Sequence, residues 1–225
     1  MNLIVKSESL IGNRSRNLDR IVEFNTGKVC GCVLIDGFSS LDASFHYVDF
    51  LVNYFNEMIV DGMDIDRVES VFYECSIAKT ECIGKAAMAV VLYSENEVRS
   101  LTIGDVRIYF LSERERSVDD SLAQRLIASG LAPEESINKH PLRNKLTKYI
   151  SKDSNHTLPS FISRMVKIGD IIVMCTDGFW SSYKDDDIFN ISSSKNLIEL
   201  VCSIYDFNGK GKDNISASFL QFQST

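Results

Sequence analysis

The sequence contains few histidines, few prolines and no long apolar run. None of its three histidines, His46, His140 and His156, has the spacing of a zinc ligand pair, and no Cys-x-x-Cys motif is present. Because serine and cysteine hydrolases need an imidazole base, this scarcity also argues against that class. No apolar run approaches the ~18 residues that span a bilayer, and the apolar stretch within residues 1–10 is too short for a signal peptide. We therefore expect a cytoplasmic protein without membrane contact, whose six cysteines are reduced and mostly buried.

Positive charge is also in deficit. The chain has 24 lysines and arginines against 31 aspartates and glutamates, which gives a formal net charge of −7. An acidic surface repels phosphate backbones, and this argues against a nucleic-acid partner. A hydrophobic content of 44% in 225 residues is enough for one sizeable core, and the three prolines mark no linker. We therefore expect a single domain over residues 1–225.

Apolar patterns predict strands and helices in alternation along the chain. Short apolar runs predict strands at residues 29–36, 85–94, 98–112, 170–178 and 214–222. Helical spacing of apolar residues, with Ser39–Ser40 and Asp64 as candidate N-caps, predicts helices at residues 41–59, 64–78, 119–130 and 195–207. Residues 138–167 are polar and are expected to hold one or two short ordered pieces. Neighbouring strands with segregated helices favour α+β layers over a parallel βαβ sheet.

Four aspartates lie at the ends of these predicted strands. Asp36 and Asp177 each follow an apolar strand and precede a glycine, Asp105 follows Gly104 inside a third, and Asp213 opens the last one. A single Asp-Gly pair is more often only a turn, so the inference depends on the whole set. Carboxylates that converge on one sheet edge repel each other unless a cation neutralises them, and such oxygen clusters suit Mg²⁺ or Mn²⁺. The Asp-x-Asp-x-Asp-Gly loop of an unrelated calcium site is absent.

The aspartates occur in the motif order of a known family. Seven segments carry the similarity: GNRSRNLD (12–19), VLIDGFSS (33–40), GKAAMAVVL (84–92), IGDVRIYFL (103–111), HPLRNKLTKYI (140–150), GDIIVMCTDGFW (169–180) and GKDNISASFL (211–220). From about Gly12 to Phe222 the chain resembles the type 2C metal-dependent serine/threonine protein phosphatases, in particular their compact bacterial branch. The resemblance implies an α+β fold, a layered β-sandwich flanked by helices on both outer faces (α-β-β-α), as a single catalytic domain.

By position in these motifs, the resemblance also assigns the metal ligands. Asp36 would bridge two Mn²⁺ or Mg²⁺ ions, and the Gly37 carbonyl would complete the shell of one of them. Asp177 and Asp213 would hold the other ion. Asp105, together with Asp177, would bind a looser third ion. The implied activity is hydrolysis of phosphoserine and phosphothreonine in proteins by a metal-activated water, on a phosphoprotein that is a serine/threonine kinase or its target.

Three further residues receive roles from the same motifs. Arg14 would bind the substrate phosphate, and Asp19 and Asn214 would orient waters or ligands from behind the metal shell. Without the resemblance, Arg14 would be interpreted as a solvated arginine beside Arg16 and Arg20. The polar segment 143–165 is expected to contact the substrate.

Several residues depart from the family pattern. They are Leu18 for a glutamate, Ser39 and Ser40 for two glycines, Lys85 and Ala86 for a Ser-Thr pair, Val106 for a serine, and Phe38 where some eukaryotic members have a histidine. None of these changes removes a metal carboxylate, so we favour an active enzyme. The alternative is a catalytically weak or silent pseudophosphatase that acts as a protein-binding regulatory module.

Other features are interpreted as structural. Asp185–Asp187 favours a helix start over a metal cluster, because adjacent side chains point in different directions. The Gly/Lys-rich residues 209–212 lack the strand–loop–helix setting of a phosphate-binding loop. Trp180 is expected in the core.

Overall fold

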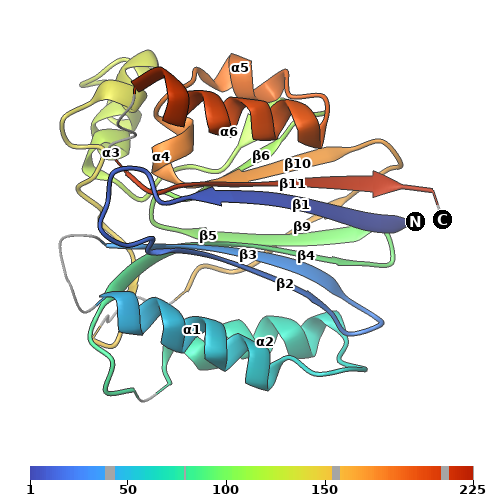
Figure 1. Cartoon of the computed structure of the whole chain (residues 1–225). Helices are drawn as coiled ribbons and strands as arrows, with labels where there is room; N and C mark the ends of the chain where they lie inside the picture. The colour runs from blue at the N-terminus through green and yellow to red at the C-terminus, as the bar shows by residue number, and fades with distance from the viewer. Residues whose placement is uncertain (39–43, 79, 154–157, 209–212, 225) are drawn as a thin grey trace.

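Two antiparallel β-sheets lie face to face at the centre of the molecule (Figure 1). The structure is a computed structural model, which describes the chain except for residues 39–43, 79, 154–157, 209–212 and 225. One sheet has the strand order β1 (Asn2–Leu10), β11 (Ile215–Gln223), β10 (Ile171–Cys175), β6 (Arg107–Phe110) and β7 (Glu115–Arg116). The other has the order β2 (Asp19–Asn25), β3 (Cys30–Gly37), β4 (Lys85–Ser94), β5 (Glu97–Ile103) and β9 (Ile162–Met165), and β8 (Ile150–Ser151) pairs with β4.

Helices cover the outer face of each sheet (Figure 1). On the β2–β9 sheet lie α1 (Ser44–Met58) and α2 (Ile65–Ser76). On the β1–β7 sheet lie α4 (Asp177–Trp180), α5 (Asp185–Phe189) and α6 (Ser194–Asn208). Helix α3 (Leu122–Ala128) and the 3₁₀ helix η1 (Glu134–Lys139) lie at one end of the sandwich. The predicted α-β-β-α sandwich is confirmed.

Strand β4 shows why both of its faces are covered. Met88 and Val90 pack with α1 and α2 in the outer apolar layer, whereas Ala89 and Val91 pack between the two sheets. Side chains alternate across a strand, so a run that is apolar at every position buries both faces. A third apolar layer, under α4 to α6, is centred on the fully buried Trp180.

Most predicted elements are confirmed, including Asp64 as the N-cap of α2, where its carboxylate accepts a hydrogen bond from the Arg67 amide. The prediction of one strand over residues 98–112 is wrong. The chain leaves one sheet after β5 and enters the other at β6. Gly104, with φ +95°, makes this change of direction, and a Cβ there would lie 2.4 Å from the Cβ of Ala87. The predicted caps Ser39–Ser40 and the segment 209–212 lie outside the described residues.

Candidate active site

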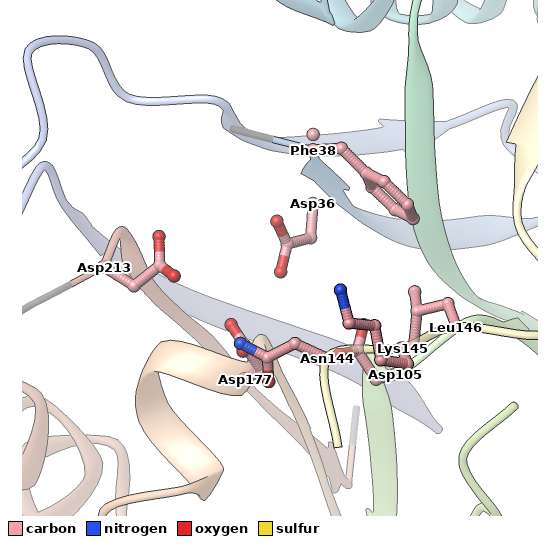
Figure 2. A pocket seen from close by; sticks show the side chains of 9 residues that line it. Asp36, Phe38, Asp105, Asn144, Lys145, Leu146, Asp177 and Asp213 are labelled. Atoms are coloured by element: carbon pink, nitrogen blue, oxygen red, sulfur yellow. The ribbon is translucent and has the colours of Figure 1, made fainter. Parts of the chain in front are cut away.

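The four strand-end aspartates meet at one pocket. Asp36 lies near the end of β3, Asp105 between β5 and β6, Asp177 at the start of α4, and Asp213 just before β11. The cavity has a volume of about 290 Å³ and is lined by Asp36, Gly37, Phe38, Asp105, Asn144, Lys145, Leu146, Asp177 and Asp213. Figure 2 shows the four carboxylates around its interior. Both sheets therefore contribute acid groups to one rim.

Burial and mutual repulsion disfavour charge on these carboxylates. The pKa of Asp36 is well above its usual value, because the group is buried and faces Asp19, its direct cross-strand partner. Burial, followed by the charge of Asp177, likewise raises the pKa of Asp105. The pKa of Asp177 is raised by burial and by Asp213. A cluster of this kind is stabilised when positive charge enters it.

Two arginines already supply part of that charge. Arg14 donates from Nε and one terminal nitrogen to the two carboxylate oxygens of Asp213, at 3.0 and 2.9 Å. Arg143 donates to Asp177 at 3.0 Å. Among the described residues, no group of three or more acidic, histidine or cysteine side chains is arranged to hold an ion. Two of the four acids instead face guanidinium groups.

The donor chemistry of the pocket nevertheless fits a hard divalent cation. The carboxylates of Asp36 and Asp105 accept no hydrogen bond from any residue that the structure describes. Carboxylate oxygens that no protein group binds are the ligands that Mg²⁺ and Mn²⁺ prefer. Gly37 brings its backbone close to the same rim, and a Cβ there would come within 2.8 Å of Val48.

Asn214 fixes the loop that carries Arg14. Its side-chain amide donates to the carbonyls of Ile11 and Arg16 at 2.8 and 3.0 Å, and its carbonyl oxygen accepts from the Leu18 amide at 2.8 Å. All three of these side-chain hydrogen bonds of Asn214 thus join it to residues 11–18. Asn214 is 4% exposed, so the residue holds this loop against the start of β11.

Asp19 lies directly behind the pocket. One carboxylate oxygen accepts a hydrogen bond from the Thr176 hydroxyl at 3.1 Å, and the other is buried without a partner among the described residues. Burial raises the pKa of Asp19 to about 7. A proton, a water molecule or an ion would supply the partner that this buried oxygen lacks.

Comparison with known proteins gives these observations a context. No family model matches the chain. It is 28% identical over 149 residues to a putative protein phosphatase 2C-type of Streptococcus pyogenes, covering 63% of this chain and 59% of that protein. It is also 26% identical over 139 residues to the serine/threonine protein phosphatase PstP of Mycobacterium tuberculosis, covering 57% of this chain and 26% of PstP. The chain therefore spans less than two thirds of the length of these relatives.

The fold agrees with these sequence matches. The solved serine/threonine phosphatase of S. agalactiae superimposes with a TM-score of 0.81 at 19% identity, over 99% of this chain and 100% of that one. A structure of the PstP catalytic domain with two manganese ions gives a TM-score of 0.73 at 17% identity, over 99% of both chains. The chain is similar in sequence to bacterial type 2C phosphatases. It also has their fold.

The departures from the type 2C pattern that fall within the described residues lie among apolar or aromatic side chains. Leu18, in place of the family glutamate, is 7% exposed and would contact a Cβ at Gly37. Ala86 and Val106, which replace hydroxyl residues, are buried in the core. The ammonium of Lys85 lies 4.5 Å from the centre of the Tyr149 ring, which in turn packs edge-on against Phe38. Leu18, Ala86 and Val106 therefore fill apolar space, whereas Lys85 and Tyr149 support Phe38 in the wall of the pocket. None of these residues is a buried, unpaired charge.

Sequence reasoning missed the cations that surround the acids. Arg143 and Lys145 lie within the motif at residues 140–150, which assigns them no role, although substrate contact is predicted for segment 143–165. Arg107 was also missed. It is fully buried, donates to Asp119 at 2.8 and 2.7 Å, and lies 3.5 Å from the Trp180 ring centre. The Trp180 indole N–H donates to the Asp105 carbonyl at 2.8 Å, so this group supports the pocket from below.

The predictions of a core position for Trp180 and of a helix start at Asp185–Asp187 are confirmed. Trp180 is fully buried, and the three aspartates occupy the first turn of α5. Asp185 accepts hydrogen bonds from Arg116 and from the Tyr109 hydroxyl at 2.6 and 2.7 Å. These partners are arginine and tyrosine side chains, as expected for a structural acid.

Proposed function

We propose that this protein is a Mn²⁺- or Mg²⁺-dependent phosphatase that hydrolyses phosphoserine and phosphothreonine in proteins. The observation that carries the proposal is the meeting of Asp36, Asp105, Asp177 and Asp213 in one pocket, with Arg14 at its border. The kinship with type 2C phosphatases supports it, as does the fold shared with a manganese-bound PstP domain.

The four aspartates would hold the ions in this scheme. Asp36 would bridge two of them beside the Gly37 carbonyl, Asp177 and Asp213 would complete one site, and Asp105 with Asp177 would hold a third. Bound ions would neutralise the carboxylates and lower the pKa of a water molecule, so that a hydroxide is available near neutral pH. Ions at Asp213 and Asp177 would compete with Arg14 and Arg143 for the carboxylate oxygens.

An Arg14 released from Asp213 would become a phosphate ligand. Its planar fork, which now engages both oxygens of Asp213, matches two oxygens of a phosphoryl group equally well. Asn214 keeps the Arg14 loop in place through three hydrogen bonds, so the guanidinium needs to rotate only about its own side chain. The negative charge that develops on the phosphoryl oxygens is thereby offset from one side of the pocket.

The test is an assay of the purified chain on a phosphothreonine peptide with and without millimolar Mn²⁺. We expect turnover only with the metal, and loss of at least 100-fold in Asp177→Asn, because one direct ligand is removed. Asp61→Asn is the matched control, since Asp61 is exposed in the loop between α1 and α2. Metal-independent turnover, or full activity of Asp177→Asn, would refute the proposal.

A second candidate function is favoured by Leu18. An apolar side chain, 7% exposed, stands where the family has a glutamate, and the loss of that carboxylate would suit a silent, protein-binding module. Leu18→Glu distinguishes the two functions. A rise from near-zero activity would identify the natural chain as a regulatory module, whereas an active natural chain would exclude that reading.

We further infer a cytoplasmic location and a phosphoprotein partner, either a serine/threonine kinase or its target. None of the helices in the described part of the chain combines the length and apolar character needed to cross a bilayer. All six cysteines are free thiols, and burial raises the pKa of Cys32 and Cys75 to about 12, which keeps both protonated and unreactive. Fractionation of cells that express a tagged chain checks the location.

A further inference from the structure

A lysine without a counterpart in the family motifs borders the acidic pocket. Lys145 lines the cavity with the four aspartates. Figure 2 shows its side chain rising from the far wall toward the space below Asp36, with Asp213 on the opposite side. The residue is exposed, so a molecule that enters the pocket from solvent can reach its ammonium group.

The backbone at Lys145 is held firmly although its side chain is exposed. Its carbonyl accepts a hydrogen bond from the Leu122 amide at 2.9 Å, at the start of α3, and its own amide donates to the Leu142 carbonyl at 3.1 Å. Two residues on, the Thr147 amide donates to the Asp120 carbonyl at 2.7 Å. The start of α3 therefore fixes the point from which the side chain reaches into the pocket.

In this structure three neighbouring cations are each paired with an aspartate. Arg14 is paired with Asp213 and Arg143 with Asp177, while Lys148 is paired with Asp120 at 3.1 Å. The structure pairs Lys145 with none of the carboxylates that it describes. Among the described lining residues, Lys145 is thus the positive group available to an incoming anion.

We propose that Lys145 binds a phosphoryl oxygen of the substrate, across the pocket from Arg14. The inference rests on the proposed function, since that function supplies the phosphate. Arg14 approaches from the Asp213 side as a two-pronged donor, and Lys145 approaches from the opposite wall as a point charge. Two cations on opposite sides hold a tetrahedral dianion more firmly than either does alone, and they orient its ester bond.

A different role would have the opposite signature. If the ammonium only balances the aspartates, then removing it leaves phosphate binding unchanged and tightens Mn²⁺ binding, because one positive charge no longer repels the ion. A phosphate ligand gives weaker phosphate binding. The two roles therefore separate on two titrations, one with inorganic phosphate and one with Mn²⁺.

The experiment compares Lys145→Met with Lys148→Met, which removes a lysine of the same segment outside the pocket. In the Mn²⁺-loaded proteins, calorimetric titration with inorganic phosphate should show roughly 10-fold weaker binding for Lys145→Met, the typical loss for one charge-assisted hydrogen bond. Lys148→Met should stay within about twofold, and Lys145→Arg should recover most of the affinity. For a phosphopeptide, KM should rise in the same proportion.

The phosphate titration and the turnover assay test the role of Lys145 and the proposed hydrolysis separately. Unchanged phosphate affinity in Lys145→Met, or no phosphate binding by the natural protein, overturns the role of Lys145. Phosphate binding that depends on Lys145 in a protein without turnover upholds the role of Lys145 and refutes the proposed hydrolysis. Turnover with unaltered KM in Lys145→Met leaves the hydrolysis standing and removes Lys145 from it.

Discussion

Replacing the buried Arg107 tests how the core supports the pocket. The Arg107 side chain has 0% exposure and that of Asp119 has 1%, and their two hydrogen bonds measure 2.8 and 2.7 Å. Arg107 also donates to the Tyr109 hydroxyl at 3.1 Å. Arg107→Met keeps the length of the side chain but leaves the Asp119 carboxylate buried without its partner. Breaking a buried pair from one side costs about 3–5 kcal/mol.

This cost translates into a large thermal effect. For a chain of this size, each kcal/mol lowers the Tm by about 2–4 °C, so Arg107→Met should lose roughly 6–20 °C. The double variant Arg107→Met/Asp119→Leu removes both charges and should recover most of the loss, because the penalty lies in the orphaned acid. Arg125→Met, the same change at an exposed site of α3, should shift the Tm by no more than about 2 °C.

The assay is thermal unfolding of the four proteins by circular dichroism, together with Mn²⁺ titration. Arg107 packs on Trp180, whose indole holds the Asp105 carbonyl, so the single variant should also bind Mn²⁺ more weakly. Equal Tm values for Arg107→Met and Arg125→Met would refute the argument. A double variant less stable than the single one would also refute it, since the unpaired charge would then not be the cause.

Three further predictions concern the residues behind the pocket. Asn214→Ala removes three hydrogen bonds and should lower the free energy of unfolding, measured in urea, by about 2–4 kcal/mol. The control Asn53→Ala, at an exposed position of α1, should lower it by less than about 0.5 kcal/mol. Equal losses in the two variants would contradict the role of Asn214. Gly178→Ala would place a Cβ 1.9 Å from the Asn214 carbonyl oxygen and should abolish soluble expression or lower the Tm by over 10 °C; normal stability would show that this backbone approach is looser. Burial raises the pKa of Asp19 to about 7, so the folded metal-free chain keeps a proton that the unfolded chain loses above about pH 4. The free energy of unfolding should therefore fall as the pH rises from about 4 to about 7. It should fall less steeply in Asp19→Asn, and an unchanged slope in that variant would mean that other groups cause the pH dependence.

The elements with one clear pattern were predictable from the sequence. Strand β4 is apolar at nearly every position and α2 begins at a capping aspartate, so local chemistry determines both. Strands β1 and β2 were missed, because their exposed positions dilute the apolar signal. The break between β5 and β6 depends on a contact between Gly104 and Ala87, a pair far apart in the sequence, and periodicity carries no information about it.

For the site, the sequence predicted which acids meet but gave no indication of how they are balanced. Strand ends and motif order were enough to select Asp36, Asp105, Asp177 and Asp213, and the structure places all four in one pocket. The pairs with Arg14 and Arg143 could not be predicted, because each joins residues that the fold alone brings together. That the four aspartates are metal ligands remains a prediction, which the Mn²⁺ titrations above test.

The arginine pairs have a consequence for how the pocket works. Four aspartates converging in a buried site would oppose folding unless positive charge were present, and Arg14 and Arg143 supply it before any ion does. A divalent cation would bring twice the charge of a guanidinium, so it would compete with both arginines for Asp177 and Asp213. An Arg14 guanidinium released in this way would face a pocket whose charge had changed from negative toward neutral. Phosphate binding should therefore require prior metal binding, and inorganic phosphate titrated into the metal-free chain should give no heat where the Mn²⁺-loaded chain binds it.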